Sequence, residues 1–361
     1  NNTSFAGQPG VVPSTIADNP NLKPERQSEI EGGFELGVLE DRAVLEFTGY
    51  FQKTKDLVLA VPLPLSSGFT SQRQNIGEVE NKGVEIALNT INVSRDNFSW
   101  RSRISFAANR NKVTQVVASA RTRDGVPIPD TLLVGYLNYV IEDQPVGIFY
   151  GGQYDRDANG AVVYCPITHA SFPGRTLQLP ERKRLTRCAT STFVNGIIGD
   201  PNPDWTGSLS NTFTLGKNLE INFLFDGRFG NDVANFTRRI TEFFGSDKRL
   251  ELEANGDTIP LTFGRNTNGR INIYEEYIED GSFIKLRELT ASYTVTAPFV
   301  QRLGANNMRL SLSGRNLLTF TDYSGLDPEL NLFSANTVAQ GVDFSNTPLA
   351  RTFVFGVHFG F

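Results

Sequence analysis

The sequence is poor in four residue types, since its 361 residues include one Met, two Trp, two His and two Cys. It also has no run of 18 apolar residues, and its mean hydropathy is -0.25. A transmembrane helix needs about 20 mainly apolar residues in a row, so none is predicted. A transmembrane β-strand needs only about 10 residues, of which every second one is polar. Hydropathy therefore does not exclude a β-barrel.

Charge and histidine content argue against two classes of function. The chain has 34 Lys and Arg residues and 39 Asp and Glu residues, which gives a net charge of -5. The sequence contains no basic cluster of the kind that binds nucleic acid. Neither His169 nor His358 belongs to an acid–base constellation. We therefore expect no nucleic-acid partner and no enzymatic activity.

The two cysteines, Cys165 and Cys188, are 23 positions apart in the least regular part of the chain. This spacing does not fit a CxxC metal or redox motif. In an oxidising compartment it predicts a disulfide within a loop. The alternative is two unrelated free thiols.

Phenylalanine is abundant, with 27 residues, and many of them alternate with polar residues. At the C-terminus, Phe353, Phe355, Val357, Phe359 and Phe361 are separated by Thr352, Gly356, His358 and Gly360, with Val354 as the exception. A period of two predicts a β-strand with one apolar face. The pattern recurs in eight further segments: 28–38, 42–52, 82–89, 99–109, 205–215, 219–229, 288–295 and 308–316.

The connections between these nine predicted strands are alternately short and long. The short ones include LEDR, SRDN and LGKN, and the long ones are 53–77, 111–204, 231–277 and 317–350. Short periplasmic turns and long external loops are typical of an antiparallel outer-membrane β-barrel, which is the all-β fold that we predict. A soluble β-sandwich also alternates, but its core is closed by a second sheet.

Nine strands cannot close a bacterial barrel, because its strand number is even and open edges would leave unpaired backbone groups in lipid. The chain also begins at Asn1 without Met or a signal peptide. We therefore expect part of a larger protein. Residues 1–27 are predicted to be an extracellular loop segment and 28–361 the C-terminal part of one barrel domain.

One predicted strand, FIKLRELTASY (283–293), breaks the pattern, because Lys285 and Arg287 share the outward parity of Leu289, Ala291 and Tyr293. Near the membrane interface an outward charge costs only about 0–1 kcal/mol, so both cations could meet lipopolysaccharide phosphates. A β-bulge that reverses the parity is the alternative.

The long loops contain further candidates for function. In DRDANG (155–160), Asp155, Asp157 and Asn159 occupy positions 1, 3 and 5 of a calcium loop and Gly160 position 6, although position 12 is Pro166. A solvated turn rich in Asp and Asn is the alternative to calcium. Four loop tyrosines are candidate ligand-stacking residues: Tyr136, Tyr139, Tyr150 and Tyr154. The segment 231–245 is predicted to be an amphipathic helix capped by Asn231.

Several segments in collinear order resemble the C-terminal barrel of SusC/RagA-like TonB-dependent transporters. They are NPNLKPE (19–25), NIGEVENKGVEI (75–86), DQPVGIFYGGQYD (143–155), IGDPNPDW (198–205), YIEDGSFIKLRELTASY (277–293) and SGRNLLTFTDYSGLDPEL (313–330). The resemblance implies the last nine strands of a 22-stranded outer-membrane barrel, preceded by a plug and a TonB box.

The resemblance also implies a function. Proteins of this kind import oligosaccharides or peptides with a SusD-like surface lipoprotein, energised by the TonB–ExbB–ExbD complex. A C-terminal strand that ends in Phe is similar to the signal read by the barrel assembly machinery, which assigns that role to Phe361. A passive porin or an adhesin-type barrel is the alternative function.

Overall fold

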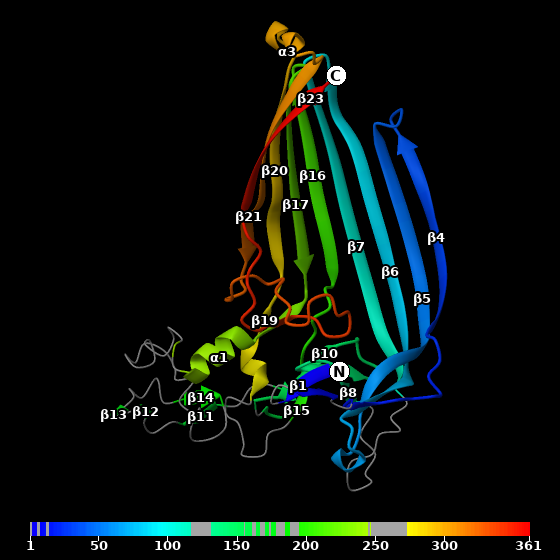
Figure 1. Cartoon of the computed structure of the whole chain (residues 1–361), viewed down its shortest axis with the longest axis vertical. Coiled ribbons are helices and arrows are strands. Elements are labelled where there is room, and N and C mark those ends of the chain that lie inside the picture. The colour runs from blue at the N-terminus through cyan, green and yellow to red at the C-terminus, as the bar shows by residue number, and fades with distance from the viewer. Residues whose placement is uncertain are drawn as a thin grey trace.

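The computed structural model describes residues 2–5, 8–11, 14–116, 131–154, 156–160, 164–166, 170–172, 175–177, 185–187, 195–244, 246 and 273–361. The longest strands form one curved, mainly antiparallel sheet, which is an arc of barrel wall (Figure 1). Along the arc its strands are β23 (Thr352–Gly360), β21 (Asn307–Thr321), β20 (Phe283–Val295), β17 (Leu219–Phe229), β16 (Trp205–Leu215), β7 (Phe98–Val116), β6 (Ser71–Arg95), β5 (Ala43–Pro62) and β4 (Arg26–Val38). The nine predicted strands are thereby confirmed, and the short β3 (Ile16–Ala17) adds to β6 in parallel.

The strand registers place the apolar residues on the convex face. Within the β16–β17 pair, Leu209 lies opposite Phe225 and Phe213 lies opposite Ile221, whereas Ser208 lies opposite Asp226 on the concave face. Because successive residues of a strand point to opposite faces, each spanning strand has a lipid face and a lumen face. A polar lumen face and an apolar outer face are the arrangement of an outer-membrane barrel.

Asn211 is a polar residue on the lipid face, and its side-chain oxygen is hydrogen-bonded there. Asn211 is 5% exposed, and its side-chain oxygen accepts hydrogen bonds from the Trp100 indole N–H at 2.7 Å and from the Ser102 hydroxyl at 2.6 Å. A buried amide without partners would be costly in lipid. Its two partners come from the neighbouring strand β7, so the sheet itself meets that requirement.

At one end of the arc the connections are tight, and at the other they are long (Figure 1). The C-terminus lies at the tight-turn end, beside the short helix α3 (Pro298–Arg302). Short turns are periplasmic in outer-membrane barrels, so this end faces the periplasm. Within the described residues, no helix is long and apolar enough to cross a membrane.

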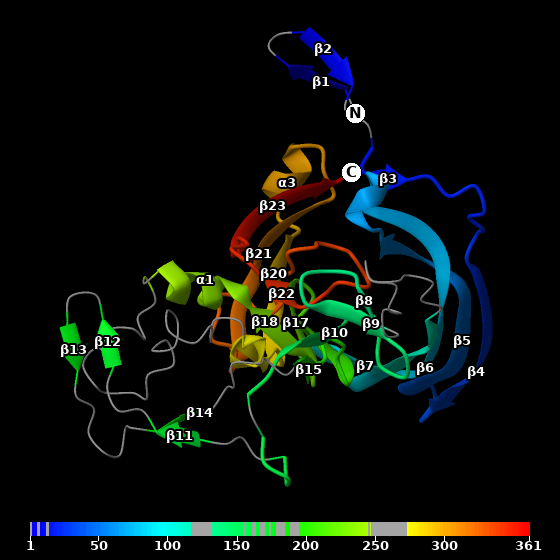
Figure 2. The ribbon, with the colours of Figure 1, turned by 90° about the horizontal axis from the view of Figure 1, so that it is seen from below.

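The long loops build a layer within the concave side of the arc, here called the loop layer (Figure 2). One of its sheets has the strand order β15 (Asn195–Gly199), β10 (Ile148–Gly152), β9 (Asn138–Ile141) and β8 (Thr131–Leu133). The other consists of β19 (Ile278–Asp280), β18 (Asp232–Asn235) and β22 (Val342–Asp343). Outside these sheets lie η1 (Leu65–Ser67), η4 (Tyr274–Tyr277), α1 (Phe236–Phe244) and the hairpins β1 (Asn2–Phe5) with β2 (Gln8–Val11), β11 (Tyr164–Pro166) with β14 (Leu185–Arg187), and β12 (Ala170–Phe172) with β13 (Arg175–Leu177).

The loop layer is held by two apolar cores. One joins Leu59, Val79 and Val113 of the barrel strands to Leu132 and Val140 of the loop layer. The other consists of Leu137, Phe149, Ala234, Phe236 and Val342. Contacts from several loops and from the barrel wall therefore fix the position of the loop layer.

The predicted helix over 231–245 is shorter in the structure. Residues 232–235 pair with β19 and β22 as strand β18, and α1 begins at Phe236. The cap is Asn235 and not Asn231, because the Asn235 side-chain oxygen accepts the backbone N–H of Arg238 at 2.9 Å. Sheet pairing therefore prevails over helix propensity in the first turn.

Deleting Phe361, or replacing it with Asp, is expected to lower the amount of folded barrel far more than Phe355→Ala does. Phe355 lies within β23, where truncation of one lipid-facing aromatic ring costs about 2–3 kcal/mol of a large barrel's stability. Phe361 follows β23, and in the assembly-signal role that the resemblance implies it would be read before a barrel exists. The measurement is the folded, heat-modifiable band of the full-length protein at equal synthesis. Equal losses for both variants would contradict the signal role.

Candidate functional site on the concave face

A cavity on the concave face has a volume of about 620 Å³. Its lining is mostly polar and includes Thr48, Glu85, Arg103, Ser105, Ser208, Asp226, Arg228 and Glu329. The hydroxyls of Ser105 and Ser208 share a hydrogen bond of 2.6 Å across β7 and β16. Arg103 and Arg228 make no ion pair with any described residue, so their donors are available to a hydrophilic solute.

A second polar cavity of about 310 Å³ lies beside it on β4, β5, β6 and β7. The Gln52 amide donates to the Glu29 carboxylate at 2.9 Å, and the Tyr50 hydroxyl donates to the Asn109 side-chain oxygen at 3.2 Å. Carboxylates, amides and hydroxyls thus face the lumen together. Strand parity already placed Glu29 and its neighbours on this side, but the sequence alone did not single them out as a site.

Lys285 and Arg287 do not face lipid, and their predicted contact with lipopolysaccharide is wrong. The pairing of β20 with both neighbours shifts register around Arg287, which is the β-bulge alternative. On the C-terminal side of the bulge, Leu289 lies opposite Phe223 on the lipid face. On its N-terminal side, Lys285 lies opposite Asp226 on the lumen face. The bulge thereby turns both cations inward.

Both cations are neutralised in what we call the Lys285 cluster: Lys285, Arg287, Asp226, Asp327 and Glu329. The Lys285 ammonium, with its side chain 3% exposed, lies 2.6 Å from the Asp327 carboxylate and 2.5 Å from that of Glu329. Arg287 pairs with Asp226 and lies 2.5 Å from Glu329. Since Asp327 and Glu329 belong to the connection between β21 and β23, this cluster fastens that loop to the barrel wall.

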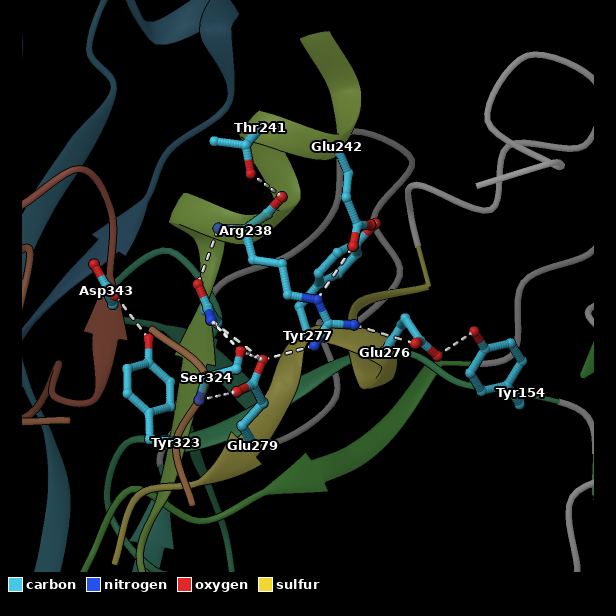
Figure 3. A network of polar contacts seen from close by, with 11 residues as sticks. Tyr154, Arg238, Thr241, Glu242, Glu276, Tyr277, Glu279, Tyr323, Ser324 and Asp343 are labelled. Carbon is cyan, nitrogen blue, oxygen red and sulfur yellow. Dashed lines mark hydrogen bonds and ion pairs between the residues drawn. The ribbon is translucent and has the colours of Figure 1, made fainter. Parts of the chain in front are cut away.

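A second charged group, the Arg238 cluster, joins α1 to the loop layer (Figure 3). The Arg238 guanidinium donates to the carboxylates of Glu279 at 2.6 Å, Glu276 at 3.2 Å and Glu242 at 3.2 Å. Its side chain is 10% exposed and lies 5.3 Å from the centre of the Tyr277 ring. One arginine therefore connects the helix to η4 and β19, whose residues lie about 40 positions further along the chain.

Two buried tyrosines extend these contacts as hydrogen-bond donors. The Tyr277 hydroxyl donates to Glu242 at 3.0 Å, and the Tyr323 hydroxyl donates to Asp343 at 2.7 Å. Burial and the neighbouring carboxylate raise the pKa of both phenols well above the ordinary value of 10.0. Both hydroxyls thus remain protonated donors over the physiological pH range.

Acidification is expected to loosen the loop layer. Burial by itself raises the pKa values of Glu279 and Glu329, but hydrogen bonds from Ser324 and Arg238, and from Arg287 and Lys285, bring them below the ordinary 4.5. A carboxyl group whose pKa is lower in the folded state than in the unfolded state stabilises the fold at pH values above its unfolded-state pKa. This stabilisation is lost as the pH falls through the folded-state pKa. Hydrogen exchange of 273–280 and 322–343, corrected for intrinsic rates, should be constant from pH 7 to 5 and rise below pH 4.5. Unchanged protection below that pH would contradict this.

All four predicted ligand-stacking tyrosines contact other side chains of the protein. Tyr139 and Tyr150 meet edge to face with ring centres 5.3 Å apart, and Tyr154 is 6% exposed with its hydroxyl donating to Glu276 at 2.6 Å. Tyr136 contacts Phe236 at 4.7 Å and is 48% exposed, so its ring is the most accessible of the four. Their role in ligand binding stays a prediction.

The calcium hypothesis also stays a prediction. Asp155 lies outside the described residues, while the Asp157 carboxylate accepts the backbone N–H of Asn159 at 2.8 Å in a turn that ends at Gly160, with φ +82°. Within the described part of the chain, no group of three or more His, Cys, Asp or Glu residues is placed to hold a metal ion.

The disulfide prediction concerns side chains outside the described part, since Cys188 lies there and only the backbone of Cys165 is described, in β11. We expect thiol labelling under denaturing, non-reducing conditions to detect neither sulfur in protein isolated from cells. In the chain-entropy model, closing a loop of this length stabilises the protein by about 3 kcal/mol. Two labelled cysteines, at the level of a fully reduced control, would contradict the prediction.

Together, an apolar convex face, a polar concave face and long loops at one end define an outer-membrane β-barrel wall. Over residues 1–317 the chain matches the family model described as TonB dependent receptor-like, beta-barrel. The chain therefore belongs to the TonB-dependent receptor β-barrel family and is located in the outer membrane. Its curated relatives are TonB-dependent receptors, not enzymes.

The chain resembles curated receptors over nearly its whole length. It is 32% identical over 98% of its length to TonB-dependent receptor P3 of Formosa agariphila. It is 25% identical over 96% of its length to TonB-dependent receptor SusC of Bacteroides thetaiotaomicron. The alignments cover 36% and 33% of these relatives, so the chain spans about a third of their length and is a partial barrel.

A solved structure has the same fold. The RagAB peptide importer in its closed-closed state matches 99% of the chain with a TM-score of 0.72 and 23% identity. The match covers 38% of that chain. At this identity the likeness concerns the fold.

Proposed function

We propose that the protein to which this chain belongs actively imports oligosaccharides or peptides across the outer membrane. The observation that carries the proposal is the polar lumen face, where a cavity of about 620 Å³ offers charges of both signs to a hydrophilic solute. Such a face would bind sugars or peptide groups through hydrogen bonds. The structurally similar RagAB complex is a peptide importer, which supports the peptide alternative.

The proposal includes two partners. A SusD-like surface lipoprotein would cover the loop layer, because two apolar cores and two charged clusters hold that layer as a preorganised platform. The TonB–ExbB–ExbD complex would supply energy through a plug and TonB box outside this chain. The family to which the chain belongs supports this second partner.

The test is uptake of labelled oligosaccharides and peptides by cells that express the full-length gene, with and without TonB. Active import predicts uptake that is lost without TonB. The double variant Arg103→Gln/Arg228→Gln should lower uptake, because it removes both lumen guanidinium groups, whereas Arg302→Gln on the periplasmic helix α3 should leave it unchanged. Uptake independent of TonB would indicate a passive porin, and cell adhesion without uptake an adhesin.

A further inference from the structure

The convex face of the barrel wall contains an apolar groove of about 410 Å³. Its floor is a cross-strand pair of glycines, Gly207 of β16 and Gly227 of β17, both on the lipid face. A Cβ on Gly227 would lie 2.9 Å from the Phe229 ring and from the Phe283 carbonyl oxygen, so glycine is required there. Leu209, Phe225 and Ile284 form the walls.

Stacked aromatic rings border the groove, with Trp205 and Phe229 on its extracellular side and Phe106 beside Gly207. Trp205 lies opposite Phe229 with ring centres 4.0 Å apart, and Phe106 of β7 lies 5.8 Å from Trp205. Aromatic girdles mark the membrane interfaces of outer-membrane barrels. The groove therefore opens into the hydrocarbon of the outer leaflet, just below the interface.

Further along the same face, two cations are cross-strand neighbours. Lys82 of β6 lies opposite Arg110 of β7, and both share the outward parity of Ile86 and Phe106. The Arg110 guanidinium donates to the backbone oxygen and the carboxylate of Asp204, both at 2.7 Å, while Lys82 makes no ion pair with any described residue. Like charges on directly opposite residues of neighbouring strands destabilise the sheet. A bound anion would therefore stabilise the pair of Lys82 and Arg110.

We propose that the groove holds an acyl chain of a phosphorylated glycolipid of the lipopolysaccharide class, with a phosphate bound by Lys82 and Arg110. Arg110 is four positions after Phe106 on β7, which corresponds to a rise of roughly 13 Å along the strand. This distance is enough to reach from the hydrocarbon to the headgroup layer. A 150 Å³ cavity holds a benzene molecule, so a groove of about 410 Å³ has room for a length of hydrocarbon chain. The site lies on the wall opposite the lumen and is independent of the import function.

The experiment uses the full-length protein, extracted from outer membranes in mild detergent, with bound lipid identified and counted by native mass spectrometry. Lys82→Gln/Arg110→Gln removes the phosphate ligands, and Ile284→Trp fills the groove. Each is expected to lower the retained glycolipid by about tenfold. The charge variant loses hydrogen bonds to charged groups, which contribute more than neutral ones, and the tryptophan variant loses the space for the acyl chain. Matched controls are Lys217→Gln at a periplasmic turn and Leu312→Trp on the lipid face outside the groove.

Heat-modifiable migration first establishes that each variant is folded, and if the double charge variant fails to fold, Ile284→Trp decides alone. Unchanged glycolipid retention in the folded variants would overturn the proposal. So would equal losses in Lys217→Gln and Leu312→Trp, which would indicate nonspecific annular lipid. Retention of glycerophospholipid in place of glycolipid would overturn it as well.

Discussion

Phe223→Arg is expected to prevent the full-length protein from accumulating in the outer membrane. Phe223 lies mid-strand in β17, opposite Leu289 on the lipid face, and its ring centre is 5.7 Å from that of Phe225. An arginine at the bilayer midplane costs about 2–4 kcal/mol, in addition to the lost aromatic contacts. The measurement is the folded, heat-modifiable protein in the outer-membrane fraction at equal synthesis.

The matched control is Leu224→Arg, the same substitution one position further along β17. Leu224 lies opposite Ser210 and Glu288, so its side chain faces the lumen, where water and a carboxylate can accommodate a guanidinium. This variant should accumulate close to the level of the unmodified protein. Equal losses for the two variants would show that the assigned parity of β17 is incorrect.

Lys285→Met should release the connection between β21 and β23 from the barrel wall. The Lys285 ammonium lies within 2.6 Å of both Asp327 and Glu329, and its removal leaves these carboxylates without their most buried cation. Breaking a buried ion pair costs about 3–5 kcal/mol. The readout is hydrogen exchange in a peptide covering 322–343, which should become much faster while the β16 and β17 peptides stay protected.

Arg309→Met is the control for that result. Arg309 pairs with Glu220 at 2.7 Å, but the two side chains are 48% and 44% exposed. An exposed pair of this kind contributes about 0–1 kcal/mol, so exchange should change little. If 322–343 remained protected in Lys285→Met, the cluster would not be what fastens the loop.

Strand parity was the part of the fold most accessible from the sequence. The alternation of Leu219, Ile221 and Phe223 with Glu220 and Asn222 assigns each side chain to lipid or lumen, and the observed registers agree. A slip of one residue would exchange the two faces, so the alternation specifies the register strongly. The same argument identified β23 and its apolar face.

Lys285 and Arg287 show where parity alone fails. A bulge inserts a residue without any change in composition, so the sequence allowed both a lipid-facing and a lumen-facing interpretation. The acidic partners that decide between them, Asp327 and Glu329, lie about 40 residues further along the chain. Their position depends on how the last long loop folds into the barrel.

The Arg238 cluster was inaccessible from the sequence for a related reason. Glu276 and Glu279 lie on η4 and β19, beyond a long connection from α1, and no local periodicity links them to Arg238, whereas Glu242 is its i+4 neighbour on α1. The helix boundary at Phe236 likewise depends on sheet pairing of 232–235 with β19 and β22. The partners of Arg238 on η4 and β19 therefore follow only from the tertiary fold.

The unequal lengths of the wall strands determine how a solute can approach the barrel. At about 3.3 Å per residue, the 25 residues of β6 extend roughly 80 Å, against roughly 36 Å for the 11 residues of β16. The rim is therefore high along β5 to β7 and low along β16 and β17. On the high side, Ile76 and Val79 of β6 pack against Leu132 and Val140 of the loop layer. A solute that approaches this part of the wall therefore meets a lower edge along β16 and β17 than along β5 to β7.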